Sequence, residues 1–134
     1  MAAIPLMLIP FILYNIAMLG AFGGGGVEGL KTVVTSVNMM SGATWTMSLG
    51  DLFIVISLVI LFFEIFKATR RSSVALLDHL FSMALFVIFL VEFLLVQGAA
   101  TQIFFILMLV SLVDVIAGFT VSIKSASRDV AIGL

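Results

Sequence analysis

Four long apolar runs divide the sequence, and glycine, polar or charged residues separate them. A run of about 20 apolar residues is long enough for a helix to cross the hydrocarbon core of a bilayer. The pattern therefore predicts an all-α membrane protein, a bundle of four transmembrane helices that forms a single domain over residues 1–134. The predicted spans cover residues 4–22, 51–68, 79–97 and 102–123, with a tail at 124–134.

The segment between the first two spans, residues 23–50, carries two further patterns. Early apolar positions recur at helical spacing, which indicates a short amphipathic helix lying on the membrane surface. These positions are Leu30, Val33, Val34 and Val37. The stretches TSVNMM and TWTMSL then alternate on either side of Ser41-Gly42, a pattern typical of a small β-hairpin. We expect this segment to form an outer cap, with Trp45 at the level of the lipid headgroups.

Composition agrees with a membrane protein and excludes several other classes. Hydrophobic residues make up 63% of the chain and charged residues 10%, against about 45–50% and 25% in soluble domains. A net charge of -1 leaves no basic surface for nucleic acid, and the absence of cysteine excludes disulfides and thiol chemistry. The lipid bilayer is therefore the expected environment.

The distribution of basic residues predicts the orientation. Five of the six bases follow the second or the fourth run, and the loop between the third and fourth runs has no charge. Because bases favour the cytoplasmic side, we expect both termini in the cytoplasm and residues 23–50 outside. The five bases are Lys67, Arg70, Arg71, Lys124 and Arg128. A signal peptide is the alternative for the first run, but no Lys or Arg precedes it, which favours a retained helix.

No motif in the chain indicates a cofactor or an enzyme. Gly24, Gly26 and Gly29 match G-x-G-x-x-G, but they follow a membrane helix and not the strand that a dinucleotide site requires. The single histidine, His79, cannot supply two haem ligands or a catalytic triad, and no E-x-x-H di-iron motif is present. We therefore expect no cofactor, no metal ion and no enzymatic activity.

Three acids lie inside apolar runs, namely Glu64, Glu92 and Asp114, and Asn15 adds a polar group to the first run. An ionised acid near the centre of a bilayer costs about 2.5–3.5 kcal/mol, so each acid must be paired, protonated or hydrated. Lys67 follows Glu64 by three residues on the same helical face, which predicts an ion pair at the helix end. Glu92 and Asp114 have no base nearby in sequence.

The surroundings of Asp114 suggest two functions. Small and polar residues recur every three or four positions on its face, namely Ser111, Asp114, Gly118 and Ser122. Such a stripe lets helices approach closely, so our preferred hypothesis is an accessory or assembly protein, acting in a homo-oligomer or a larger membrane complex. The alternative is a proton or cation conductor that uses Glu92, Asp114, Glu64 and Asn15 as its path. A lipid or quinone binding subunit is a third hypothesis, resting only on the apolar helices.

Three segments, SGATWTMSLGDL, FFEIFKATRR and SIKSASRDVAIG, resemble a group of small bacterial inner-membrane proteins. The resemblance extends over most of the chain. It implies a location in the bacterial inner membrane and carries neither an activity nor site residues.

Overall fold

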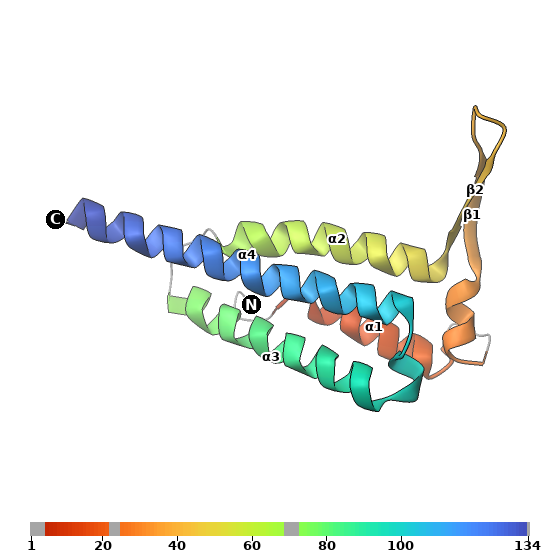
Figure 1. Ribbon diagram of the computed structural model, residues 1–134, viewed down its shortest axis with the longest axis horizontal. Coiled ribbons are helices and arrows are strands. Elements are labelled where there is room, and N and C mark those ends of the chain that lie inside the picture. Colours follow the sequence, from red (N-terminus) through yellow and green to blue (C-terminus); the bar gives the residue numbers. More distant parts are fainter. Residues whose placement is uncertain (1–4, 22–24, 69–72, 134) are drawn as a thin grey trace.

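Four α-helices and one β-hairpin make up the computed structural model, which describes residues 5–21, 25–68 and 73–133 (Figure 1). The helices are α1 (Leu8–Met18), α2 (Leu49–Ala68), α3 (Ser73–Leu95) and α4 (Gln102–Gly133). Three of them are long and apolar enough to cross a membrane, through Leu49–Lys67, Leu77–Leu95 and Gln102–Thr120.

Helix α1 is shorter than the first predicted span. Its 11 residues extend about 16 Å at 1.5 Å per residue, roughly half of a hydrocarbon core of about 30 Å. The helix stops just before Gly20, whose φ of 92° is the left-handed conformation that commonly ends a helix. The predicted ends at 4 and 22 lie outside the described residues. The described chain thus has three candidate spans and one short apolar helix.

Local hydrogen bonds fix the start of α2 earlier than the predicted residue 51. The Ser48 amide donates to Asp51 Oδ2 at 3.0 Å, and the Asp51 amide donates to Ser48 Oγ at 3.2 Å. This reciprocal pair is a capping box, in which each side chain satisfies a free amide of the first helical turn. Helix α4 begins similarly, because Thr101 Oγ1 accepts a hydrogen bond from the Phe104 amide at 3.2 Å.

The outer segment contains the predicted hairpin but not the predicted amphipathic helix. A 3-10 helix, η1 (Val27–Lys31), is followed by strands β1 (Val33–Asn38) and β2 (Thr44–Ser48), which pair antiparallel. Val33, Val34 and Val37 were expected on a helix and lie in β1 instead. β-Branched valines favour an extended backbone, and β2 supplies the partner strand that completes the hydrogen bonds.

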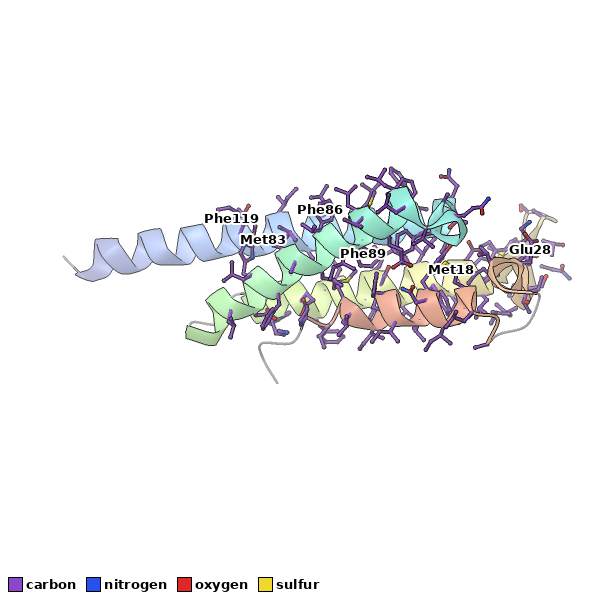
Figure 2. The ribbon with its side chains drawn as sticks, turned by 90° about the horizontal axis from the view of Figure 1, so that it is seen from below. Met18, Glu28, Met83, Phe86, Phe89 and Phe119 are labelled. Atoms are coloured by element: carbon purple, nitrogen blue, oxygen red, sulfur yellow. The ribbon has the colours of Figure 1, made fainter. Side chains whose placement is uncertain are left out.

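Helix α4 packs against both α2 and α3, while α1 and η1 lie at the end of the bundle that carries the hairpin (Figure 1). Figure 2 shows Phe89 on the side of α3 that faces α1, and its ring is fully buried. The outer faces of α2 and α3 expose large apolar side chains, as expected for surfaces in contact with lipid.

Helix α4 also continues past its candidate span through the segment expected to be a tail. It reaches Gly133 and projects beyond the nearby ends of α2 and α3 (Figure 1). The projecting part carries Lys124 and Arg128, whose side chains are not among those described.

Candidate functional site

Each of the three long helices contributes an acid to one buried group of polar side chains. We call this group the acidic cluster, and it comprises Glu64 and Lys67 of α2, Asp78 and Ser82 of α3, and Asp114 of α4. By helical rise, Asp114 lies about 18 Å from the start of α4, and Glu64 about 22 Å from the start of α2. The cluster therefore lies near the ends of the candidate spans that are away from the hairpin, with Lys67 the last residue of Leu49–Lys67, Asp78 the second of Leu77–Leu95, and Asp114 the deepest member.

Lys67 bridges two of the acids. Its Nζ atom lies 3.0 Å from Glu64 Oε1 and 3.2 Å from Asp78 Oδ1. The structure thus brings together the Glu64 and Lys67 pair expected from sequence. It adds Asp78 of the next helix, so that the base joins α2 to α3. Arg71, which follows Glu64 by seven residues in the sequence, lies outside the described residues.

Asp114 faces an acid, and no base contacts it among the described residues. Its carboxyl group lies within hydrogen-bonding reach of the Glu64 carboxyl group and the Ser82 hydroxyl. Asp114 is only 5% exposed, and its Oδ2 atom is buried without a hydrogen-bond partner in the described structure. An ionised carboxylate has no hydrogen to donate. A hydrogen bond between the two carboxyl groups therefore requires that one of them carry a proton.

The charges of the acidic cluster do not balance. With its four titratable groups ionised, three carboxylates and one ammonium group give a net charge of −2. Excess charge is costly in a low-dielectric interior, so protonation or a bound cation has to offset it. Among the described residues, no group of three or more His, Asp or Glu side chains could hold a metal ion.

The small-residue stripe around Asp114 faces the interior of the chain. Ser111 is 1% exposed, and Gly118 is also buried. These positions lie where α4 packs against α2 and α3, so the stripe serves helix contacts within one chain. The side chain of Ser122, the fourth predicted member, is not among those described.

A second polar group lies near the hairpin end of the bundle. We call it the outer polar group, and it contains Tyr14, Asn15, Glu92 and Thr101. Tyr14 donates to the Gly98 carbonyl at 2.9 Å and lies 2.7 Å from Thr101 Oγ1. These contacts tie α1 to the turn before α4.

Glu92 and Asn15 lie within hydrogen-bonding reach of each other, on α3 and α1. Asn15 Nδ2 also donates to the Phe11 carbonyl at 2.8 Å, and Glu92 Oε2 is buried without a hydrogen-bond partner in the described part of the chain. By helical rise, Glu92 is about 5 Å from the end of α3. The structure therefore brings Glu92 to Asn15 and keeps both apart from Glu64 and Asp114.

Aromatic side chains separate the outer polar group from the acidic cluster. The ring of Phe89 lies 4.9 Å from that of Phe11 and 5.3 Å from that of Phe104, measured between centroids. Phe89 and Phe104 are completely buried. Two buried hydroxyls, those of Ser57 and Ser111, lie at intermediate depth along α2 and α4. The arrangement is thus polar at two depths, with an aromatic layer in between.

Asp78 and Ser82 are members of the cluster that sequence reasoning missed. Asp78 directly precedes the third predicted span, 79–97, and was not considered among the acids inside the apolar runs. A signal was present nevertheless, since Asp78, Ser82, Leu85 and Phe89 follow one another at spacings of three or four, which places them on one face of α3. The last three are buried.

His79 lies beside the acidic cluster on α3. Its ring contacts that of Phe119 on α4 with centroids 5.4 Å apart, and its Nε2 atom is buried without a hydrogen-bond partner in the described structure. A neutral imidazole can both donate and accept a proton. His79 therefore adds a titratable group near the acidic cluster.

No family model, curated protein or solved structure matches this chain. Functional inference therefore rests on the geometry of the two polar groups.

Proposed function

We propose that this protein transfers protons within a membrane, with the acidic cluster as its proton-binding site. One observation carries the proposal, the contact between the buried carboxyl groups of Asp114 and Glu64. Two neighbouring carboxyl groups favour a shared proton, because like charges disfavour the ionisation of both, and intramembrane acids of this kind recur in proton relays. The net charge of −2 in the fully ionised cluster favours the binding of protons there.

A proton fits the cluster better than a metal ion. Lys67 already occupies the space between Glu64 and Asp78, and its ammonium group would repel a second cation. No described group of acids or histidines has the arrangement of a metal site. A proton needs only one free carboxylate oxygen, and Asp114 Oδ2 supplies it.

The order of polar groups along the bundle supports a route in steps. Glu92 would exchange protons at the hairpin end, Asp114 and Glu64 in the interior, and His79 near the opposite end. The aromatic layer around Phe89 would act as the barrier between the first two steps, because apolar rings exclude the water that carries protons. Transfer past it needs a rearrangement that brings a hydroxyl, such as that of Ser111, or water into line.

The assembly hypothesis receives less support from the geometry. Its motivating feature was the stripe that includes Ser111, Asp114 and Gly118, and these residues are buried against helices of the same chain. Oligomer formation would have to use other surfaces, such as the exposed apolar faces of α2 and α3.

We infer the orientation from the basic residues. Lys67, Arg70 and Arg71 favour the cytoplasm for the connection between α2 and α3, and Lys124 and Arg128 favour it for the C-terminus, so that the hairpin lies outside the inner membrane. In this orientation the acidic cluster lies in the cytoplasmic half of the bilayer and Glu92 in the outer half.

Proton flux into liposomes tests the proposed function. Purified protein is reconstituted with a pH-sensitive dye inside the vesicles, and a potassium diffusion potential drives proton entry. We expect flux above that of empty vesicles, reduced about a hundredfold in Asp114→Asn, because the amide cannot exchange a proton. We expect Glu92→Gln to reduce it as well.

Glu28→Gln is the matched control, since Glu28 is an exposed acid paired with Lys31 outside the predicted spans. This variant should keep the wild-type flux. Circular dichroism and gel filtration establish that each variant is folded. Wild-type flux no greater than that of empty vesicles, or an Asp114→Asn variant that conducts as well as the wild type, would rule the proposal out.

A further inference from the structure

The β-hairpin has one apolar face and one polar face, and both are exposed. Cross-strand partners lie on the same face, so the pairs Val37–Trp45 and Thr35–Met47 share one side of the hairpin. We call this side the apolar face of the hairpin, which comprises Val37, Met39, Trp45 and Met47 together with Thr35. On the other face, Ser36 pairs with Thr46 and Asn38 with Thr44, through side-chain hydrogen bonds of 3.4 Å and 3.1 Å.

Water is a poor environment for this hairpin. An isolated two-stranded hairpin is marginally stable in water, and exposed strand edges are usually protected by charged residues. No charged residue lies between Lys31 and Asp51. Val37, Met39 and Trp45 are nevertheless 44–48% exposed. A surface that covers the apolar face would supply the missing stabilisation.

The direction of the hairpin indicates which surface this is. The hairpin runs across the direction of the helices, and it rises past α2 on the side away from α3 (Figure 1). If α2, α3 and α4 cross the membrane, a segment that lies across them at their outer end runs along the membrane plane. Its six-residue strand β1 reaches about 20 Å at 3.3 Å per residue. The hairpin therefore extends over the lipid that surrounds the bundle.

The exposed apolar side of α2 would contact the same lipid. Val55, Leu58, Val59 and Phe62 are 41–57% exposed on this helix. Lipid that contacts them lies directly beneath a hairpin that projects from the start of α2. A single tryptophan on an amphipathic, uncharged segment at this depth is typical of the membrane interface.

We propose that the hairpin is a membrane-surface anchor, lying in the outer headgroup layer with its apolar face toward the acyl chains. The bound surface is lipid, and the polar face of Ser36, Asn38, Thr44 and Thr46 is directed toward water. Interfacial segments of this kind bury their apolar face about 5–10 Å into the boundary between headgroups and acyl chains. The proposal is independent of proton transfer, because the hairpin contributes no residue to the acidic cluster.

Trp45 is the only tryptophan in the chain, so intrinsic fluorescence reports on the hairpin directly. The full chain is placed in lipid nanodiscs, which leave both membrane faces open to water. We expect weak quenching by aqueous iodide and strong quenching by brominated lipids. Bromines near the headgroup end of the acyl chain should quench at least about twice as strongly as bromines near the chain end.

Two variants with an added charge provide a matched pair. Val37→Asp places the charge on the apolar face, opposite Trp45, and should shift the emission to longer wavelength and increase iodide quenching. Thr46→Asp places the same charge on the polar face and should leave both properties close to those of the wild type.

Two results with the wild-type chain would overturn the proposal. Strong quenching of the Trp45 fluorescence by iodide, without quenching by brominated lipid, would mean that the hairpin is exposed to water. Protection from both quenchers would mean that protein covers Trp45, as in a complex with a second copy of the chain.

Discussion

Replacing Asp114 by Asn should remove proton binding and yet stabilise the fold at alkaline pH. The amide has nearly the same shape as the carboxyl group, can accept from the Ser82 hydroxyl and can donate to the Glu64 carboxylate. The wild-type contact requires a shared proton, which becomes harder to retain as the pH rises. The variant makes the same contact without that proton.

The magnitude follows from the burial of Asp114, which is only 5% exposed. Replacing even a paired set of buried charges by well-packed neutral residues of similar volume is often neutral or stabilises a protein by about 1–4 kcal/mol, and the Asp114 charge has a second acid beside it. We expect a gain of about 1–3 kcal/mol in the free energy of unfolding at alkaline pH. At acidic pH, where the wild type keeps its proton, the two proteins should differ by less.

Lys67→Met provides the opposite perturbation. Removing the base leaves Glu64 and Asp78 without their shared ammonium partner, and breaking a buried ion pair costs about 3–5 kcal/mol. Because the Lys67 side chain is 19% exposed, we expect a loss near the lower end of that range. Stabilisation by Asp114→Asn and destabilisation by Lys67→Met would together indicate an excess of negative charge.

Unfolding by SDS in mixed micelles, followed by far-ultraviolet circular dichroism, measures these differences. The series is repeated at acidic and alkaline pH for the wild type and both variants. Loss of more than about 1 kcal/mol in Asp114→Asn at alkaline pH would refute the reasoning, since it would mean that an ionised Asp114 is stabilised by a base.

Two further predictions concern the contacts of α1 and the aromatic layer. Tyr14→Phe should destabilise the fold by about 1–3 kcal/mol, because the Gly98 carbonyl loses its hydrogen bond, and limited proteolysis should cleave α1 sooner. Phe89→Ala should cost about 3–5 kcal/mol in the same SDS titration, because the ring is completely buried. Leu94→Ala is its control, since Leu94 is 68% exposed on the same helix and should change stability by less than about 0.5 kcal/mol.

Hydrophobic pattern predicted the long helices well because their signal is local. A long run of apolar residues bounded by glycine, proline or charged residues directly predicts a candidate membrane-spanning helix, as in α2, α3 and the first part of α4. The same pattern overestimated α1, because hydrophobicity does not show that Gly20 ends the helix. The pattern also could not distinguish a helix from a strand over Val33–Val37. There the extended conformation depends on hydrogen bonds to the partner strand β2, which local hydrophobicity does not show.

The acidic cluster was harder to predict because its contacts join different helices. The local spacing between Glu64 and Lys67 indicated their ion pair. The contact between Asp114 and Glu64 depends on the depth at which α4 packs against α2, and Asp78 joins only because the start of α3 lies at the same depth as the end of α2. Periodicity gives the face of each helix and not the relative register of two helices.

Register also explains why one stripe could suggest two functions. A polar face on α4 is compatible with a neighbouring chain, a partner protein or the interior of its own bundle. The interior position makes the acid at 114 more costly, because Asp114 is 5% exposed and its Oδ2 atom has no hydrogen-bond partner among the described residues. If the stripe served only close packing of helices, serine or alanine at 114 would do so without that cost. A carboxyl group at 114, against a second carboxyl group from α2, is what the proposed proton binding needs and what helix packing alone does not.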